Sequence, residues 1–338
     1  MKENIKNISI IIGTMIGAGF ASGKEVYIFF AQYKVSGLVG AIISALMTAI
    51  IVYMTIKIAK HYQIKSNNQF VEQISQNKAV ASTVKKIINT FLLASFWIMC
   101  AGLCSFFKQE FNIPIIITAI ISGTLIYLIL MKNIEGIVKL NSVIVPIMII
   151  AIIVIGIKNS SCVDIVSQNK TAIIPIIKAI LYTSYNSIIL IPIIVSISGN
   201  IKNEKSTKTI SIISSTIILI LLLLIYQMLI SSKTDISKTE MPILTTLSSK
   251  VDITMYGISI ITAIITSVIS AGYGALENIK SKKAYKASVL AICMLEIPIA
   301  YIGFGNLVTV LYPVFGAIGI LQIILIVKSY CKNCKKLI

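Results

Sequence analysis

Glycines and charged residues crowd an apolar stretch near the start of the chain. The segment IIGTMIGAGFASGKEVYIFF, Ile11 to Phe30, is apolar enough to enter a membrane, yet it carries four glycines and the adjacent Lys24 and Glu25. A glycine costs a helix about 1 kcal/mol relative to alanine. A charge at the middle of a membrane costs at least about 2.5 kcal/mol. We therefore expect these residues to do chemistry that an unbroken apolar helix cannot do.

The glycines predict a break in the helix between Gly13 and Gly19, because glycine adopts non-helical angles without a Cβ clash. The outer half-helix would present the free amides of Ala18, Gly19 and Phe20, which together with the helix dipole attract an anion. The inner half would end in unpaired carbonyls between Gly13 and Ile16, which attract a cation. One break would then hold a zwitterion, or an anion with its coupling ion.

A second apolar segment, residues 172–198, is interrupted by polar side chains. Its centre carries the cluster Tyr182, Thr183, Ser184, Tyr185, Asn186 and Ser187, and it contains Pro175 and Pro192. Irregular backbone at membrane depth occurs only where it is buried in protein or lines a cavity. We therefore expect this segment to be broken too, and residues 182–186 to form the walls of a substrate site. The alternative for the first segment is close helix packing, since its glycines form two GxxxG spacings.

Three charged residues lie near the expected breaks. Lys24 and Glu25 follow the first break by about one and a half turns, and Lys178 precedes the second by a similar distance. We predict that Glu25 pairs with Lys178, because pairing removes two isolated charges from the membrane. The three would serve as an outer gate or a protonatable coupling site. In the alternative arrangement the lysines extend outward to water and Glu25 faces a wet vestibule. Glu296 is a further acid in an apolar segment, and the sequence names no partner for it.

The composition of the whole chain is that of a polytopic membrane protein. The 338 residues are 57% hydrophobic and 12% charged, whereas a soluble domain carries about 25% charge. A membrane helix needs about 20 apolar residues, and hydropathy predicts about ten such spans. These spans are residues 7–30, 37–58, 84–107, 113–131, 137–157, 172–198, 207–230, 253–275, 287–303 and 306–328.

Lysine sets the predicted orientation of these spans. The net charge is +18, and the chain contains no arginine. With a cytoplasmic N-terminus, 21 lysines fall in inner segments and 7 in outer segments. The seven are Lys34, Lys108, Lys158, Lys170, Lys233, Lys238 and Lys250. By the positive-inside rule both termini face the cytoplasm. The heavy use of isoleucine, lysine and asparagine without arginine is typical of an AT-rich genome, which predicts a bacterial cell membrane. The same rule accounts for the basic charge without a nucleic-acid partner.

Ten spans divide into two sets of five, which gives the second set the opposite orientation. That is the topology of an inverted repeat, in which interrupted spans at corresponding positions mark a substrate site. We predict one transmembrane domain over residues 1–338, with a first repeat of about 7–157 and a second of about 172–328. The expected fold is an all-α bundle with a 5+5 repeat and broken helices 1 and 6.

The motif GTMIGAGFASGKE, which begins at Gly13, resembles the first span of YkvI-like bacterial membrane proteins. More distantly, the chain resembles the amino acid–polyamine–cation transporter superfamily, whose LeuT fold has five-plus-five repeats with broken first and sixth helices. Ala263-x-x-Thr266-Ser267 is similar to the sodium-site pattern on the eighth helix of such symporters. The resemblance implies Na⁺ ligands from the carbonyls of Gly13, Ile16 and Ala263 and the hydroxyls of Thr266 and Ser267. The alternative is that these hydroxyls bond back to the preceding turn. Phe20 stands where sodium symporters often carry an asparagine, which argues against a second sodium site.

Other functions fit the sequence less well. The only histidine, His61, lies in a predicted loop, and no metal, phosphate or nucleophile motif is present. We therefore expect neither an enzyme nor a bound cofactor. Cys331 and Cys334 form half of a zinc pattern without a second half. We expect a transporter of a small solute, an amino acid above all, coupled to Na⁺. The alternatives are a proton-coupled permease and a solute sensor on the same scaffold. The sequence leaves the oligomeric state open.

Overall fold

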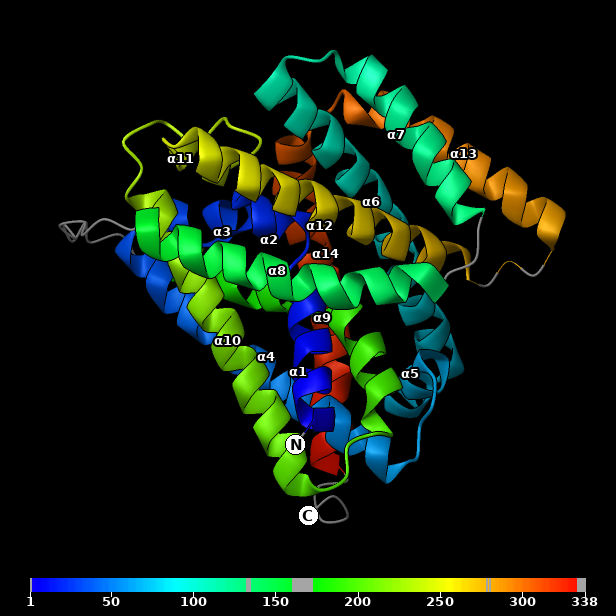
Figure 1. Cartoon of the computed structure of the whole chain (residues 1–338). Coiled ribbons are helices and arrows are strands. Elements are labelled where there is room, and N and C mark those ends of the chain that lie inside the picture. Colours follow the sequence, from blue (N-terminus) through cyan, green and yellow to red (C-terminus); the bar gives the residue numbers. More distant parts are fainter. Residues whose placement is uncertain (1, 132–134, 160–172, 278, 280, 333–338) are drawn as a thin grey trace.

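The computed structural model describes residues 2–131, 135–159, 173–277, 279 and 281–332, and within this part of the chain all regular structure is helical (Figure 1). The first half contains α1 (Lys2–Met15), α2 (Ala18–Ser22), α3 (Lys24–Phe29), η1 (Ala31–Tyr33), α4 (Val35–His61), α5 (Asn67–Ser75), α6 (Lys78–Phe111), α7 (Ile115–Leu130) and α8 (Glu135–Asn159). The second half contains α9 (Ile173–Ser198), α10 (Glu204–Ile230), α11 (Pro242–Thr246), α12 (Lys250–Leu276), α13 (Lys282–Ala300) and α14 (Phe304–Lys332). Each span expected from the sequence coincides with one of these helices, except that the first is divided into α1, α2 and α3.

The bundle has the apolar exterior of a membrane protein. Six of the described helices, α4, α6, α9, α10, α12 and α14, are long and apolar enough to cross a membrane, and α7 is a shorter apolar helix. α4 has 27 residues and is therefore about 40 Å long at 1.5 Å per residue. Large aliphatic side chains such as Leu46, Ile121 and Ile157 are more than 60% exposed. Lipid rather than water is the solvent that suits so much exposed apolar surface.

The segments that connect the helices lie at two ends of the bundle, and polar contacts join the segments at each end. At one end, bonds join α1 to α10, α4 to α10, and α14 to the segment after α5. These bonds are Asn4–Ser206 at 3.3 Å, Lys57–Glu204 at 3.4 Å and Lys332–Gln76 at 3.0 Å. The start of α1 and the end of α14 therefore lie at the same end (Figure 1).

At the other end, contacts join segments that the lysine sorting predicts to lie on the outer side of the membrane. Lys158 pairs with Asp252 at 2.7 Å, and the Tyr226 hydroxyl donates to the Lys34 carbonyl at 2.5 Å. The sorting of lysines into two sets of segments thus agrees with the arrangement of the helices. Which set faces the cytoplasm stays a prediction.

α9 lies at the centre of the bundle and packs against α1, α4 and α14, while α7 lies along α13 (Figure 1). Glycines on α14 allow the closest approach. A Cβ at Gly316 would lie 2.6 Å from the Leu181 carbonyl oxygen, and one at Gly319 would lie 2.6 Å from that of Ser184. The two backbones therefore touch where α14 crosses the polar segment of α9.

The prediction that the sixth span is broken is wrong. α9 is continuous from Ile173 to Ser198, with Pro192 inside it. Its polar side chains bond to carbonyls of their own helix. Thr183 donates to the Ala179 carbonyl at 2.9 Å, Ser184 to that of Ile180 at 2.7 Å and Asn186 to that of Tyr182 at 3.0 Å. Because these groups find partners within one turn, the helix accommodates them without a break. The inverted repeat itself stays a prediction.

Candidate functional site

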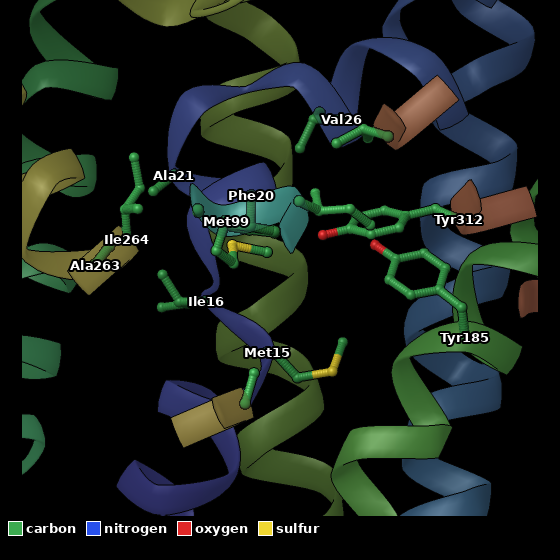
Figure 2. Packing of buried hydrophobic residues seen from close by; sticks show 14 of the residues in the cluster. Met15, Ile16, Phe20, Ala21, Val26, Met99, Tyr185, Ala263, Ile264 and Tyr312 are labelled. Carbon is green, nitrogen blue, oxygen red and sulfur yellow. The ribbon is translucent and has the colours of Figure 1, made fainter. Parts of the chain in front are cut away.

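The first span is interrupted where the glycines predicted a break. The last helical hydrogen bond before the break runs from the Ile16 N–H to the Ile12 carbonyl at 3.0 Å. The first one after the break runs from the Ala21 N–H to the Gly17 carbonyl at 2.9 Å. Gly17 between them is extended, with φ −90° and ψ −176°. A helix end leaves its last four carbonyls and its first four amides without intrahelical partners. The break thus leaves carbonyls at the end of α1 and amides at the start of α2 without intrahelical partners, among buried residues. Figure 2 shows the non-helical ribbon between Ile16 and Phe20.

A second bend follows at Gly23, whose φ of +80° lies in the left-handed region. Glycine adopts this conformation without the steric cost that other residues incur. The bend turns the start of α3 back toward α2, so that the side chain of Glu25 folds over Gly19. A Cβ built at Gly19 would overlap the Glu25 carboxyl group, with the Cδ atom 2.6 Å away. Glycine at position 19 is therefore what makes room for this acid.

Glu25 is only 4% exposed and accepts a hydrogen bond of 2.5 Å from the Tyr185 hydroxyl. That distance is typical of a hydroxyl bound to a carboxylate. The predicted Glu25–Lys178 pair is not formed in the structure. The Lys178 ammonium instead lies over the Phe29 ring, 5.6 Å from its centroid. Tyr185 lies on the same face of α9 as Lys178, about two turns further along the helix.

Aromatic rings from three helices surround this carboxylate. The ring centroid of Phe29 on α3 lies 5.5 Å from those of both Tyr182 and Tyr185 on α9. The Tyr312 ring on α14 stacks on Tyr185 at 4.6 Å. Figure 2 shows Tyr185 and Tyr312 side by side next to Phe20, on the opposite side of the break from Ala263. The site is thus an acid enclosed by rings beside a helix break.

The structure separates the predicted wall residues of α9. Tyr182 and Tyr185 face α3, whereas the Thr183 hydroxyl lies 3.3 Å from the Ser44 carbonyl of α4. The Ser184 carbonyl faces α14, and Asn186 bonds within its own helix. Only the two tyrosines therefore join Glu25.

Lys24 connects the first span to the loop between α10 and α11. Its ammonium donates to the carbonyls of Ser237 at 3.2 Å and Thr239 at 2.8 Å. In the same loop, Glu240 accepts a bond of 2.5 Å from the Gly305 N–H at the start of α14. These bonds tie the loop between α10 and α11 to the starts of α3 and α14. The gating or proton-coupling role of Lys24 stays a prediction.

The residues of the predicted sodium site lie on α1, in the break that follows it and on α12, which packs against α2. Ile16 and Ala263 are both buried and face the break (Figure 2). The Thr266 hydroxyl donates to the Ala263 carbonyl at 3.0 Å, which is the alternative bond within its own helix. Gly13 and Ser267 are half-buried. Their roles as Na⁺ ligands stay predictions.

Sequence reasoning missed several residues of the site. No sequence motif surrounds Phe29 or Tyr312 that would distinguish them from aromatic residues that only fill the core. Tyr256 on α12 donates to the Ala21 carbonyl at 3.0 Å and so fixes α2 in place. The sequence also did not identify the partner of Glu296. That partner is Ser122 on α7, whose hydroxyl donates to Oε1 of Glu296 at 2.5 Å. Of the zinc-like pair, Cys331 is an exposed free thiol and Cys334 lies outside the described residues.

Comparisons with known proteins agree with a membrane protein of transporter fold. No family model matches the chain. It is 24% identical to the uncharacterized membrane protein YkvI of Bacillus subtilis over 326 residues, which cover 92% of the chain and 91% of YkvI. It is 22% identical to the uncharacterized protein YyaD of the same organism over 332 residues, 94% of each protein. The resemblance to YkvI-like proteins is thereby confirmed.

Among solved structures, the chain is similar to a mutant of the manganese transporter of Eremococcus coleocola. The TM-score is 0.63 at 13% identity, and the match covers 95% of this chain and 77% of the transporter. A second structure of that transporter, in complex with an aromatic bis-isothiourea substituted compound, matches with a TM-score of 0.50 over 99% of this chain and 72% of the transporter. At this identity the similarity shows the fold, which resembles that of a membrane transporter.

Proposed function

We propose that the chain is a secondary active transporter that moves a small amino acid or a related solute together with Na⁺ by alternating access. The observation that carries the proposal is the break between Met15 and Ala18 inside an apolar bundle. In lipid an interrupted helix is tolerated only where it is buried in protein or lines a cavity, and such breaks hold substrates and ions in transporters. The similarity to a transporter fold supports the same conclusion.

The site would be asymmetric within a 5+5 repeat of the amino acid–polyamine–cation superfamily. The first span supplies unwound backbone, with the amides of Ala18, Gly19 and Phe20 next to the acid. The continuous α9 supplies side chains, above all Tyr182 and Tyr185. We place the protein in the cell membrane with both termini in the cytoplasm, because the lysine-rich end of the bundle carries the start of α1 and the end of α14.

Na⁺ would bind between the carbonyl end of α1 and α12. The proposed ligands are the carbonyls of Gly13, Ile16 and Ala263 and the hydroxyls of Thr266 and Ser267. A hard cation prefers such oxygen ligands. The Thr266 hydroxyl uses its proton to bond Ala263, which leaves the lone pairs of its oxygen available to a cation.

One observation favours a second candidate, a proton-coupled permease. Glu25 is buried, and its partner is the Tyr185 hydroxyl rather than an ammonium. A carboxyl group in such surroundings can exist in the neutral form without leaving a cation unpaired. Intramembrane acids of this kind form proton relays in transporters. Under this candidate, a proton on Glu25 replaces Na⁺ as the coupling ion.

The test is solute-dependent stabilisation of the purified protein, followed by uptake into liposomes. A ligand that binds only the folded state raises its melting temperature, so amino acids and Mn²⁺ are compared in Na⁺ and in K⁺. Under the proposal, one amino acid stabilises the protein only in Na⁺, and Thr266→Ala or Ser267→Ala abolishes this effect. Thr254→Ala, an exposed position on α12, is the matched control. Uptake driven by a pH gradient without Na⁺ would favour the permease, and binding without uptake would indicate a sensor.

A further inference from the structure

Glu25 is a buried acid that no basic side chain of the described residues neutralises. The ion pairs found there are Lys57–Glu204, Lys85–Glu72, Lys158–Asp252, Lys202–Glu3 and Lys208–Glu204. The neighbouring Lys24 directs its ammonium to loop carbonyls, and Lys178 directs its own to a phenyl ring. A buried charge is stable only when it is paired and hydrogen-bonded. The Tyr185 hydroxyl supplies one hydrogen bond but no charge.

The rings around Glu25 are suited to a cation. The face of an aromatic ring attracts an ammonium group within about 6 Å of its centroid. Phe29 already receives the Lys178 ammonium at 5.6 Å. The same ring lies 5.5 Å from Tyr182 and from Tyr185. The protein's own lysine therefore shows that a primary ammonium is accommodated on this aromatic wall.

The helix break also favours a positive charge over a negative one. α2 has only five residues, so its dipole is much smaller than that of a long helix. The Glu25 carboxyl lies against Gly19, where an incoming carboxylate would meet a like charge. The α1 end of the break presents carbonyls instead. Gly17 faces open space, because a Cβ there would meet no atom within 4 Å.

We propose that Glu25 is the binding partner for the ammonium group of the transported solute, and that Phe29, Tyr182, Tyr185 and Tyr312 enclose that group. The solute class is then primary amines, of which amino acids are one member. A carboxylate on the solute is not required. This inference rests on the proposed transport function and names the part of the solute that the site recognises.

The test uses three probes of similar size with the full-length protein in detergent: n-propylamine, propionate and alanine, each titrated at constant pH and ionic strength. We expect n-propylamine and alanine to raise the melting temperature and propionate to have no effect. Glu25→Gln keeps the shape of the side chain and an acceptor for Tyr185, and it should weaken amine binding about tenfold or more, as expected for loss of a charged partner. Glu277→Gln, at an exposed acid, is the matched control.

A second variant keeps the inference testable if Glu25→Gln does not fold. Lys178→Met removes the ammonium that occupies the Phe29 ring, and it should leave amine binding unchanged or tighten it. Weaker amine binding in Lys178→Met would count against the inference. Under the inference, the Phe29 ring that Lys178 vacates should receive the ammonium of the solute more easily, not less easily.

The outcomes separate the inference from the transport function. If propionate stabilises the protein as alanine does and n-propylamine does not, recognition is through the carboxylate and the inference is wrong, while transport stands. If Glu25→Gln binds amines normally but loses the pH dependence of uptake, Glu25 carries a proton and the inference is again wrong. If no probe binds and no amino acid is taken up by liposomes, both the inference and the transport function are rejected.

Discussion

Alanine at Gly19 should destabilise the protein, whereas alanine at Gly17, two residues earlier, should not. A Cβ at Gly19 would meet Cδ of Glu25 at 2.6 Å and Cγ at 2.7 Å, so the whole end of that side chain must move. A Cβ at Gly17 would meet no atom within 4 Å. The φ of −90° at Gly17 also suits any L-residue.

The size of the effect follows from the bond that is lost. Moving Glu25 breaks its hydrogen bond with Tyr185, and a bond to a charged group contributes about 1.5–3 kcal/mol to the free energy of unfolding. Alanine in place of glycine within α2 offsets about 1 kcal/mol through helix propensity. The net loss for Gly19→Ala is therefore about 0.5–2 kcal/mol. Gly17→Ala should gain about 0.4–1 kcal/mol, because it restricts the unfolded chain.

The assay is thermal unfolding of the purified variants in the same detergent, without added solute. Gly19→Ala is also combined with Glu25→Ala, which removes the side chain that the new methyl group would displace. In that background Gly19→Ala should be neutral or stabilising by up to about 1 kcal/mol, which corresponds to a coupling free energy of about 0.5–3 kcal/mol. Equal melting temperatures for the two alanine variants would refute the placement of Glu25 over Gly19. A loss at Gly19 that persists after Glu25→Ala would refute it as well.

Three further changes test other contacts. Lys24→Met should release the loop between α10 and α11, seen as faster hydrogen exchange there, while equal exchange would contradict its anchoring role. Gly316→Val should lower the melting temperature by more than a substitution at an exposed residue does, because its Cβ would lie 2.6 Å from the Leu181 carbonyl oxygen. An unchanged melting temperature would contradict the close packing of α14 against α9. Ser122→Ala removes the hydroxyl that donates to buried Glu296 and should lower the free energy of unfolding by about 1–3 kcal/mol. Thermal unfolding measures this change, and an unchanged melting temperature would argue against the hydrogen bond.

Local sequence was sufficient for features that depend on neighbours in the chain. The glycines predicted a break between Gly13 and Gly19, and the backbone is interrupted at Gly17, where glycine adopts an extended conformation at little cost. Gly13 and Gly19 themselves lie inside α1 and α2, so the pattern bounded the break without naming its residue. Hydropathy located the helices, since each span must satisfy its own backbone bonds in lipid. Lysine sorting predicted which connections share an end of the bundle.

The sixth span shows where local pattern was ambiguous. A run of hydroxyl and amide side chains suits a broken helix, but it suits a continuous helix equally well when each group reaches a carbonyl one turn earlier. In α9, Thr183 and Ser184 do so. Polar content alone therefore does not distinguish a break from a self-satisfied helix.

The partners of the charged residues were decided by tertiary structure. The sequence by itself placed Lys24 and Glu25 just beyond the break of the first span, and it predicted a partner only for Glu25, namely Lys178. The bend at Gly23 and the packing of α9 and α14 bring Tyr185, not Lys178, to Glu25, and a loop more than 200 residues away in the chain receives Lys24. A helix pattern gives the spacing of residues along one axis. The contacts between helices depend on how the backbones bend and how closely they approach, and these are properties of the assembled bundle.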